Sequence, residues 1–121
     1  MSDAGKKAHH IKIDPEPASV RVELGGEVIA ETSAAVVLRE GSIPPVYYIP
    51  REDVRPEVLT ATSRLTHCPF KGDASYWTLE AGGKTLENAV WSYQDPFDQV
   101  AAIKGHMAFY VDRVDSFIIG D

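Results

Sequence analysis

The sequence contains one cysteine, Cys68, and has no excess of positive charge. A single cysteine cannot form an intrachain disulfide, so ordinary packing must hold the fold together. The chain has 12 Lys and Arg residues against 18 Asp and Glu residues, which gives a formal net charge of -6. Because nucleic-acid binding depends on clustered Lys and Arg, we expect no nucleic-acid partner.

Long apolar runs are also absent. No segment approaches the roughly 20 apolar residues that a membrane-spanning helix needs. The N-terminal stretch MSDAGKKAHHIKIDPEPA has no apolar segment of signal-peptide length. These features predict a cytoplasmic protein with no membrane association.

The chain lacks the pattern of a nucleotide-binding fold. No glycine-rich phosphate loop precedes a helix, and strand and helix patterns do not alternate along the sequence. At 121 residues, the chain is long enough for one core and too short for two. We therefore expect one domain that is not built on a parallel sheet.

The pattern that is present is a series of short strands. In residues 19–32, SVRVELGGEVIAET, apolar and polar residues alternate up to Gly25-Gly26, which predicts a hairpin. Residues 74–94 repeat this pattern around Gly82-Gly83. Residues 34–40 form a third β-rich run, GSIPP breaks it, and VYYIP begins a fourth. A further strand is expected around residues 64–67, and another in HMAFYVDRV.

Helical patterns are few. A single turn is expected near residues 52–55, because Pro56 interrupts any longer helix there. A short helix is expected after Asp95, which can cap it, with Pro96 at its first position and Gly105 just beyond its end.

The two ends of the chain differ in pattern from the rest. Residues 1–17 are polar, and we expect a flexible arm there in which His9 and His10 are solvated, since a metal site needs more ligands. Residues 18–115 are expected to form the domain, and residues 116–121 a C-terminal tail. The predicted fold is thus mainly β, built from antiparallel hairpins, with one or two short helices.

Four spaced motifs, YYIPREDV, THCPFKGDASYW, WSYQDP and IKGHMAFY, resemble the domain-of-unknown-function family number 427. This family comprises small, mostly bacterial proteins without an established activity, and the resemblance covers roughly residues 19–114. It implies a β-tent fold, in which two antiparallel sheets meet at an angle. The same fold occurs in zinc-bearing methionine sulfoxide reductases and in the drug-binding domain of cereblon.

This sequence departs from those zinc-bearing relatives. Their zinc is commonly held by paired Cys-x-x-Cys motifs, whereas Cys68 stands alone, with only His67 and His106 as nearby companions. We therefore expect no structural zinc and no cofactor. Reductase chemistry typically needs a resolving thiol beside the attacking one, and the sequence has no second thiol.

The family also carries a label of nucleotidyltransferase type, which the residues support poorly. That chemistry usually needs paired carboxylates that hold magnesium against phosphates. Asp95 and Asp98 fit helix capping, and Asp112 and Asp115 fit the end of a strand.

The stretch THCPFKGDASYW is the candidate site. Pro69 and Gly72 predict a stiff loop, and binding residues often lie on such loops of a β scaffold. Cys68 is interpreted either as a nucleophile favoured by Lys71 and His67 or, more commonly for a free cysteine, as a small buried side chain. Lys71 is either a solvated charge, the default for lysine, or an anion contact, and His67 is either a structural residue or an acid/base.

Aromatic residues on the predicted strands suggest a pocket. Each one taken singly is more often core, and alternation cannot show which of them face inward. Together with Arg51 after YYIP, they would suit a flat or cationic ligand, and the aromatic cage of cereblon supports this by analogy. The predicted ligand-binding residues are Tyr48, Arg51, Lys71, Trp77, Trp91 and Tyr93.

Three functions follow from these observations. The first is a domain that binds a small-molecule ligand in an aromatic-lined pocket edged by Arg51 and the Cys68 loop. The alternative is a small enzyme in which Cys68 is the nucleophile or a neighbour such as His67 is the acid/base. A third option is a protein-interaction module with an exposed sheet edge. The oligomeric state and the identity of the ligand do not follow from the sequence.

Overall fold

The first hairpin forms where the alternating pattern predicted it. In the computed structural model, which describes residues 10–120, β2 (Val20–Leu24) pairs antiparallel with β3 (Glu27–Thr32). The chain reverses through Gly25 and Gly26, whose φ angles are 62° and 81°. These are left-handed angles that glycine adopts at little cost, which explains why the turn lies there.

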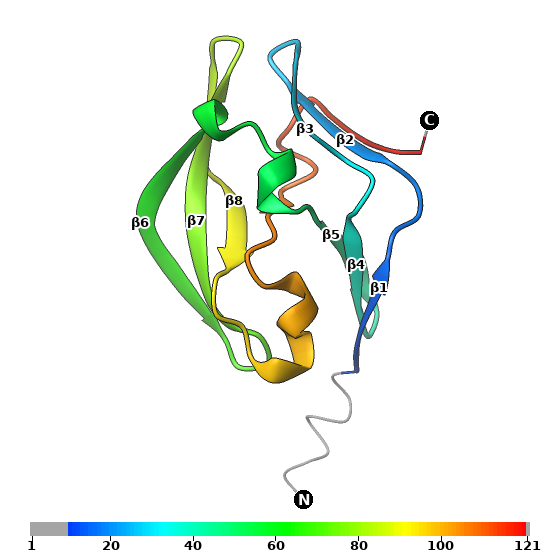
Figure 1. Cartoon of the computed structure of the whole chain (residues 1–121). Coiled ribbons are helices and arrows are strands. Elements are labelled where there is room, and N and C mark those ends of the chain that lie inside the picture. The colour runs from blue at the N-terminus through cyan, green and yellow to red at the C-terminus, as the bar shows by residue number, and fades with distance from the viewer. Residues whose placement is uncertain (1–9, 121) are drawn as a thin grey trace, which may run out of the picture.

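The second hairpin is also confirmed, and it is the longest feature of the fold. β7 (Gly72–Ala81) and β8 (Lys84–Tyr93) reverse at Gly82-Gly83. β6 (Leu59–Cys68) pairs with the edge of β7 that faces away from β8, and the short β9 (Ala108–Phe109) pairs with the free edge of β8. The result is a four-stranded antiparallel sheet in the order β6-β7-β8-β9 (Figure 1).

A second sheet contains prolines inside one of its strands. Its order is β1-β4-β5, with β4 at Val36–Glu40 and β5 at Ile43–Tyr48. The sequence predicted that GSIPP would separate two strands, but only Gly41 and Ser42 form the turn, and β5 already includes Pro44 and Pro45. β5 is an edge strand with a register shift opposite these prolines, so their missing N–H groups cost no ladder hydrogen bond.

Both predicted tails contain strands. β1 (Ile11–Pro15) pairs with β4, so the prediction of a flexible arm over residues 1–17 is wrong for this part of it. Residues 1–9 and 121 lie outside the described residues. β10 (Ser116–Ile119) pairs with β2, so residues 116–119 are the third strand of the β10-β2-β3 sheet rather than a tail.

The mainly β, antiparallel class is therefore confirmed, although residues 10–120 form three sheets instead of the two expected. The β2-β3 and β4-β5 hairpins belong to different sheets, and β10 and β1 each add a third strand to one of them. Figure 1 shows the β6–β8 sheet on one side and the strands β1–β5 on the other. The angle between sheets that defines a tent stays a prediction.

Helical structure is limited to short 3-10 turns in the described part of the chain. η1 (Arg51–Asp53) and η2 (Pro56–Val58) lie where one turn was expected. η3 (Asp98–Ile103) replaces the helix predicted from Pro96 to Lys104, and Phe97 rather than Asp95 precedes it. Val100 leaves helical angles in the middle of η3 and is fully buried, as is Ile103, so core packing decides the local backbone.

The core consists of two clusters of buried side chains. The hairpin cluster lies between the first and second hairpins and includes Val20, Val22, Leu24, Ile29, Trp77, Leu79 and Val90. The tyrosine cluster lies toward η3 and includes Leu38, Tyr48, Tyr76, Tyr93, Val100 and Ile103. Together they connect all three sheets.

The two hairpin turns touch through backbone alone. A Cβ atom added to Gly82 would overlap the carbonyl group of Gly25, and one added to Gly25 would overlap the carbonyl group of Ala81. Asp115 reinforces the contact, because its Oδ2 accepts from the Gly25 N–H at 2.8 Å and its Oδ1 accepts from Lys84 Nζ at 2.8 Å. The hairpins therefore close against one another at a point where no side chain would fit.

Candidate functional site

The loop between β6 and β7 carries a buried ion pair. Lys71 Nζ donates to Glu40 Oε1 at 2.8 Å, and the two side chains are only 11% and 9% exposed. The Phe97 N–H donates to the Lys71 carbonyl at 2.9 Å, so the η3 segment holds the loop in place. The sequence favoured a solvated Lys71, but its side chain is buried because Glu40, at the end of β4, provides the opposite charge.

Cys68 lies beside this pair. Its Sγ is 3.7 Å from Lys71 Nζ, and the side chain is half-buried against the tyrosine cluster. The Lys71 ammonium group can therefore donate a hydrogen bond to this sulfur. The structure thus brings together Cys68 and Lys71, as the sequence suggested, and adds Glu40, which the sequence did not indicate.

His67 has a different environment from Cys68. Its Nδ1 lies 2.7 Å from Asp73 Oδ1, and its ring meets the edge of Phe97 with 6.4 Å between centroids. The side chains of His67 and Cys68 point to opposite faces of the sheet, because successive residues alternate along β6. The carboxylate that contacts His67 belongs to Asp73, which the sequence did not indicate. The tight β6–β7 turn pairs these two residues directly.

Tyr48 and Tyr93 are buried in the tyrosine cluster. Burial raises the pKa of Tyr48 to about 12, although a hydrogen bond from Trp91 partly opposes this shift. Burial also raises the pKa of Tyr93 above its ordinary value, and the nearby Tyr48 and Cys68 add to the shift. Both hydroxyl groups therefore stay neutral above pH 10, where an ordinary tyrosine begins to ionise.

Trp77 lies in the other part of the core, the hairpin cluster, and Arg51 contacts it from the surface. The Arg51 guanidinium carbon is 5.2 Å from the centroid of the Trp77 ring, and Trp77 is buried in the hairpin cluster. Arg51 itself is exposed on η1. The predicted ligand-binding residues are thus divided between the two core clusters, because Tyr48 and Tyr93 belong to the tyrosine cluster and Trp91 packs against it.

A cavity of about 450 Å³ opens beside Trp91. Its walls come from β5, β8, β9 and the turn after β9, and we call it the aromatic cavity. The Trp91 and Tyr110 rings are 4.6 Å apart and tilted by 50°. Ile43 and Val111 are 52% and 56% exposed, which is unusual for large apolar side chains. The lining residues are Ile43, Pro44, Pro45, Val46, Tyr47, Trp91, Phe109, Tyr110, Val111 and Asp112.

Of the predicted ligand-binding residues, Trp91 lines the aromatic cavity. The sequence placed Tyr47, Phe109 and Tyr110 on strands, but alternation alone could not show which face was hollow. Nothing in the sequence around Pro44, Pro45 and Val111 indicated that these residues would line a cavity. They become part of the cavity because β5 runs along the β9 end of the four-stranded sheet, where Ile49 and Met107 form a β-bridge.

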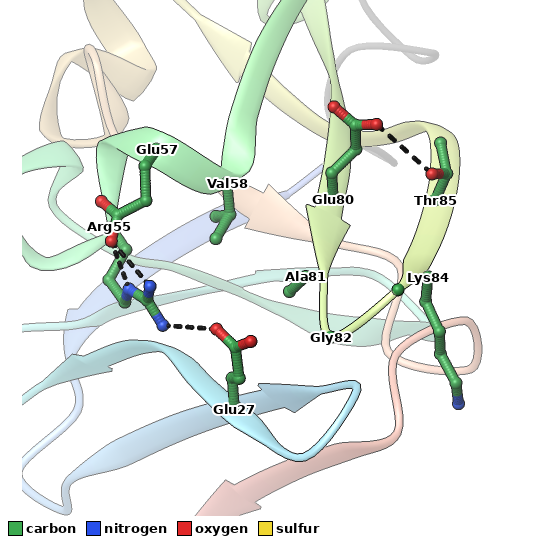
Figure 2. Close-up of a pocket in the computed structure, with 10 residues that line it drawn as sticks. Glu27, Arg55, Glu57, Val58, Glu80, Ala81, Gly82, Lys84 and Thr85 are labelled. Carbon is green, nitrogen blue, oxygen red and sulfur yellow. Dashed lines mark hydrogen bonds and ion pairs between the residues drawn. The ribbon is translucent and has the colours of Figure 1, made fainter.

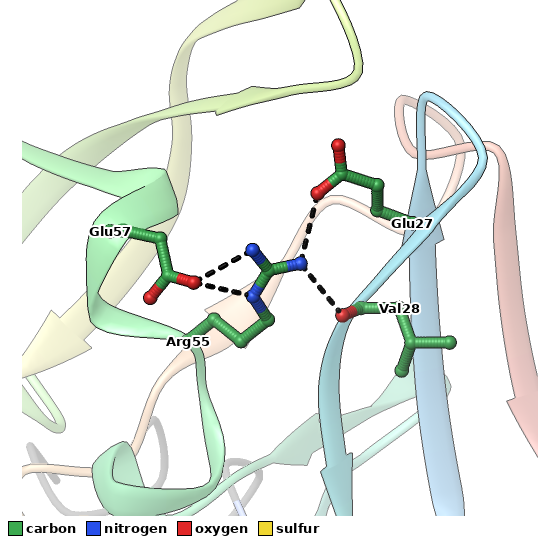
Figure 3. A network of polar contacts seen from close by, with 4 residues as sticks. All are labelled: Glu27, Val28, Arg55 and Glu57. Carbon is green, nitrogen blue, oxygen red and sulfur yellow. Dashed lines mark hydrogen bonds and ion pairs between the residues drawn. The ribbon is translucent and has the colours of Figure 1, made fainter.

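A second cavity, of about 490 Å³, lies beside the contact between the two hairpin turns and is polar (Figure 2). The Arg55 guanidinium group lines one side of it. Arg55 Nε donates to Glu57 Oε2 at 2.8 Å, and Arg55 Nη1 donates to Glu27 Oε1 at 2.9 Å (Figure 3). Hydrogen bonds to these two carboxylates raise the pKa of Arg55. Both cations of the lining are already paired, Arg55 with Glu27 and Glu57 and Lys84 with Asp115, which makes this cavity a weaker candidate for a ligand.

Metal ligands are not gathered anywhere in residues 10–120: no group of three or more His, Cys, Asp or Glu side chains there could hold a metal ion. Of the tail pair, His10 is exposed and His9 lies outside the described residues. The described residues also include no helix that is long and apolar enough to cross a membrane.

The sequence was compared with protein-family models, and residues 12–120 match the model described as Domain of unknown function (DUF427). The chain belongs to this family. The match begins within β1 and ends just after β10, so the DUF427 domain comprises all three sheets. The comparison with curated proteins found no match. The family description names no activity, and the function must therefore be argued from the geometry of this chain.

Proposed function

We propose that this DUF427 domain binds a small apolar or aromatic ligand in the aromatic cavity. The observation that carries the proposal is an apolar hollow of about 450 Å³ whose rim exposes Ile43 and Val111 to solvent. Ligand sites typically have volumes of roughly 300–1,000 Å³ and mostly apolar walls. Exposed apolar side chains gathered around such a hollow are a recurring mark of a binding surface.

The main wall of the cavity is held in position before any ligand enters. The Trp91 indole donates to the Tyr48 hydroxyl, and its ring packs against Tyr110. Tyr110 in turn is hydrogen-bonded to Tyr76. The Tyr76 hydroxyl is also hydrogen-bonded to the Thr66 hydroxyl, with 2.9 Å between the two oxygen atoms. A wall fixed in this way loses little conformational entropy on binding, which favours affinity.

The test is a thermal-shift screen of small aromatic and apolar metabolites, followed by NMR titration that monitors the Trp91 indole N–H. A ligand that binds only the folded state should raise the melting temperature. Val111→Asn should weaken binding several-fold (roughly three- to tenfold) by placing a polar amide on the apolar rim without changing its charge. Val28→Asn is the matched control, because Val28 is also exposed, at 39%, and does not line the aromatic cavity. Equal effects of the two substitutions would contradict the proposal.

A second candidate function is nucleophilic chemistry at Cys68, and the 3.7 Å contact with Lys71 favours it. In this alternative, Cys68 loses its proton to solvent and its Sγ forms a bond to an electrophilic carbon of the substrate, whose leaving group departs with the electrons of the broken bond, while Lys71 Nζ donates a hydrogen bond to the sulfur. The rate of alkylation by iodoacetamide at pH 7 should then exceed that of the urea-unfolded chain and fall in Lys71→Met. A thiol that reacts only after unfolding would remove this candidate.

A further inference from the structure

The aromatic cavity has an uneven distribution of charge. Of the ten residues that line it, Asp112 is the one that carries a full charge near pH 7, and its side chain is exposed at the rim. The remaining walls are aromatic, aliphatic or proline side chains. An anionic ligand would meet a carboxylate and no cation among these residues, so the lining selects against anions.

The aromatic walls themselves favour a positive charge. The faces of Trp and Tyr rings carry partial negative charge and attract cations, with Trp the most effective. Tyr110 already shows this property, because the Arg113 guanidinium carbon lies 5.8 Å from the centroid of its ring. Trp91 packs against the same Tyr110 ring and forms the adjoining wall.

The net charge of the protein also favours a cation, although two arginines oppose it. A net charge of -6 attracts cations toward the protein. Arg64 and Arg113 are the opposing groups, since both act electrostatically on Tyr110. Neither arginine lines the aromatic cavity. Arg113 should therefore weaken, but not abolish, the attraction of a bound cation.

We infer that the aromatic cavity accepts an organic cation with a compact apolar body, of the tertiary or quaternary ammonium class. This inference rests on the proposed function and names the ligand class for the same cavity. Bulky ammonium groups are weakly hydrated, so they lose less on entering an apolar hollow than a primary ammonium does. Asp112 supplies the counter-charge at the rim, and Trp91 and Tyr110 supply the ring faces.

The test uses three water-soluble probes of similar shape and different charge: choline, 3,3-dimethylbutan-1-ol and 3,3-dimethylbutanoate. Indole serves as a neutral aromatic probe. NMR titrations of the whole chain should give choline an affinity about fivefold higher than its neutral analogue, with no binding of the anion. Raising the salt concentration from about 20 to 300 mM should weaken choline binding and leave the neutral alcohol unchanged.

Two variants separate charge from shape. Asp112→Asn should lower the affinity for choline about threefold without affecting 3,3-dimethylbutan-1-ol, because the carboxylate lies at an exposed rim. Arg113→Gln should raise the affinity for choline, since it removes a positive charge that lies 5.8 Å from the Tyr110 ring centroid. Equal binding of choline and the alcohol, together with no effect of Asp112→Asn, would overturn the inference. If indole alone binds, the ligand-binding function stands and the cation inference fails; if no probe binds and the screen gives no ligand, both fail.

Discussion

Lys71 and Glu40 form an ion pair inside the protein, with 2.8 Å between Nζ and Oε1, although 31 residues separate them in the sequence. The pair joins the β6–β7 loop to the end of β4 and thereby connects two sheets. Burying two charges is costly, and their mutual attraction offsets that cost only while both are present.

Removal of one partner should therefore be strongly destabilising. We expect Lys71→Met to lower the free energy of unfolding by about 3–5 kcal/mol, because the Glu40 carboxylate stays buried without the ammonium group. The double variant Glu40→Leu/Lys71→Met should recover most of this loss. Urea denaturation of the two single variants and the double variant measures the coupling. Independent, additive losses would show that the pair is not the source of the effect.

Gly25 and Gly82 provide a steric test of how the hairpins meet. Gly82 and Gly83 have φ angles of 57° and 82°, so alanine is strained at both positions, but a Cβ at Gly83 meets nothing within 4 Å. Gly82→Ala should destabilise the fold by about 1–3 kcal/mol more than Gly83→Ala, because only the former overlaps the Gly25 backbone. Thermal and urea unfolding of the two variants measure the difference. Equal losses would indicate that backbone strain alone explains these glycines.

Tyr48 predicts a loss of stability at alkaline pH. Its pKa rises from 10.0 to about 12 on folding, mainly because of burial. The folded state thus holds the phenol proton more tightly, so this contribution is fully present below pH 10 and is lost as the pH rises through 12. This rise in the pKa of Tyr48 corresponds to about 2–3 kcal/mol of the free energy of unfolding.

The measurement is the free energy of unfolding between pH 9 and 12 in the wild type and in Tyr48→Phe. The variant should be less stable near pH 7, because the Trp91 N–H loses its acceptor, but it should show a shallower alkaline decline. Tyr47→Phe is the control at the neighbouring, partly exposed tyrosine. An unchanged alkaline slope in Tyr48→Phe would contradict the assignment.

Arg51 should contribute modestly to stability and not to the aromatic cavity. Its guanidinium group lies 5.2 Å from the Trp77 ring centroid at an exposed position, where such contacts are worth about 0.5–1 kcal/mol. Arg51→Gln should therefore cost less than about 1 kcal/mol and leave the affinities of the cavity probes unchanged. A loss of probe binding would instead return Arg51 to the ligand site predicted from the sequence.

The hairpins could be predicted from the sequence because their signals are local. Paired glycines and period-two alternation lie within the same 14 to 21 residues that form each hairpin. β1 and β10 could not be predicted in this way, since β4 and β2 supply the pairing that makes them strands. The polar composition of residues 1–17 pointed to an arm, although residues 11–15 form β1.

The candidate site was predictable only within one loop. Cys68 and Lys71 are three residues apart beside Pro69, which made their proximity a reasonable expectation. Glu40 could not be found, because nothing in its own segment marks it as the partner of a distant lysine. The aromatic cavity was missed as a unit for a related reason, since its walls come from strands whose neighbours are set by tertiary contacts.

The pairing of β10 with β2 has a consequence for biosynthesis. Phe117 lies opposite Val22, so an early segment of the chain acquires its partner only after nearly the entire matched domain has left the ribosome. Such distant pairing slows the search for the native state and keeps an incomplete sheet edge open meanwhile. We therefore expect this domain to reach its native state only after β10 has left the ribosome, with protection by chaperones most useful while the β2 edge is uncovered.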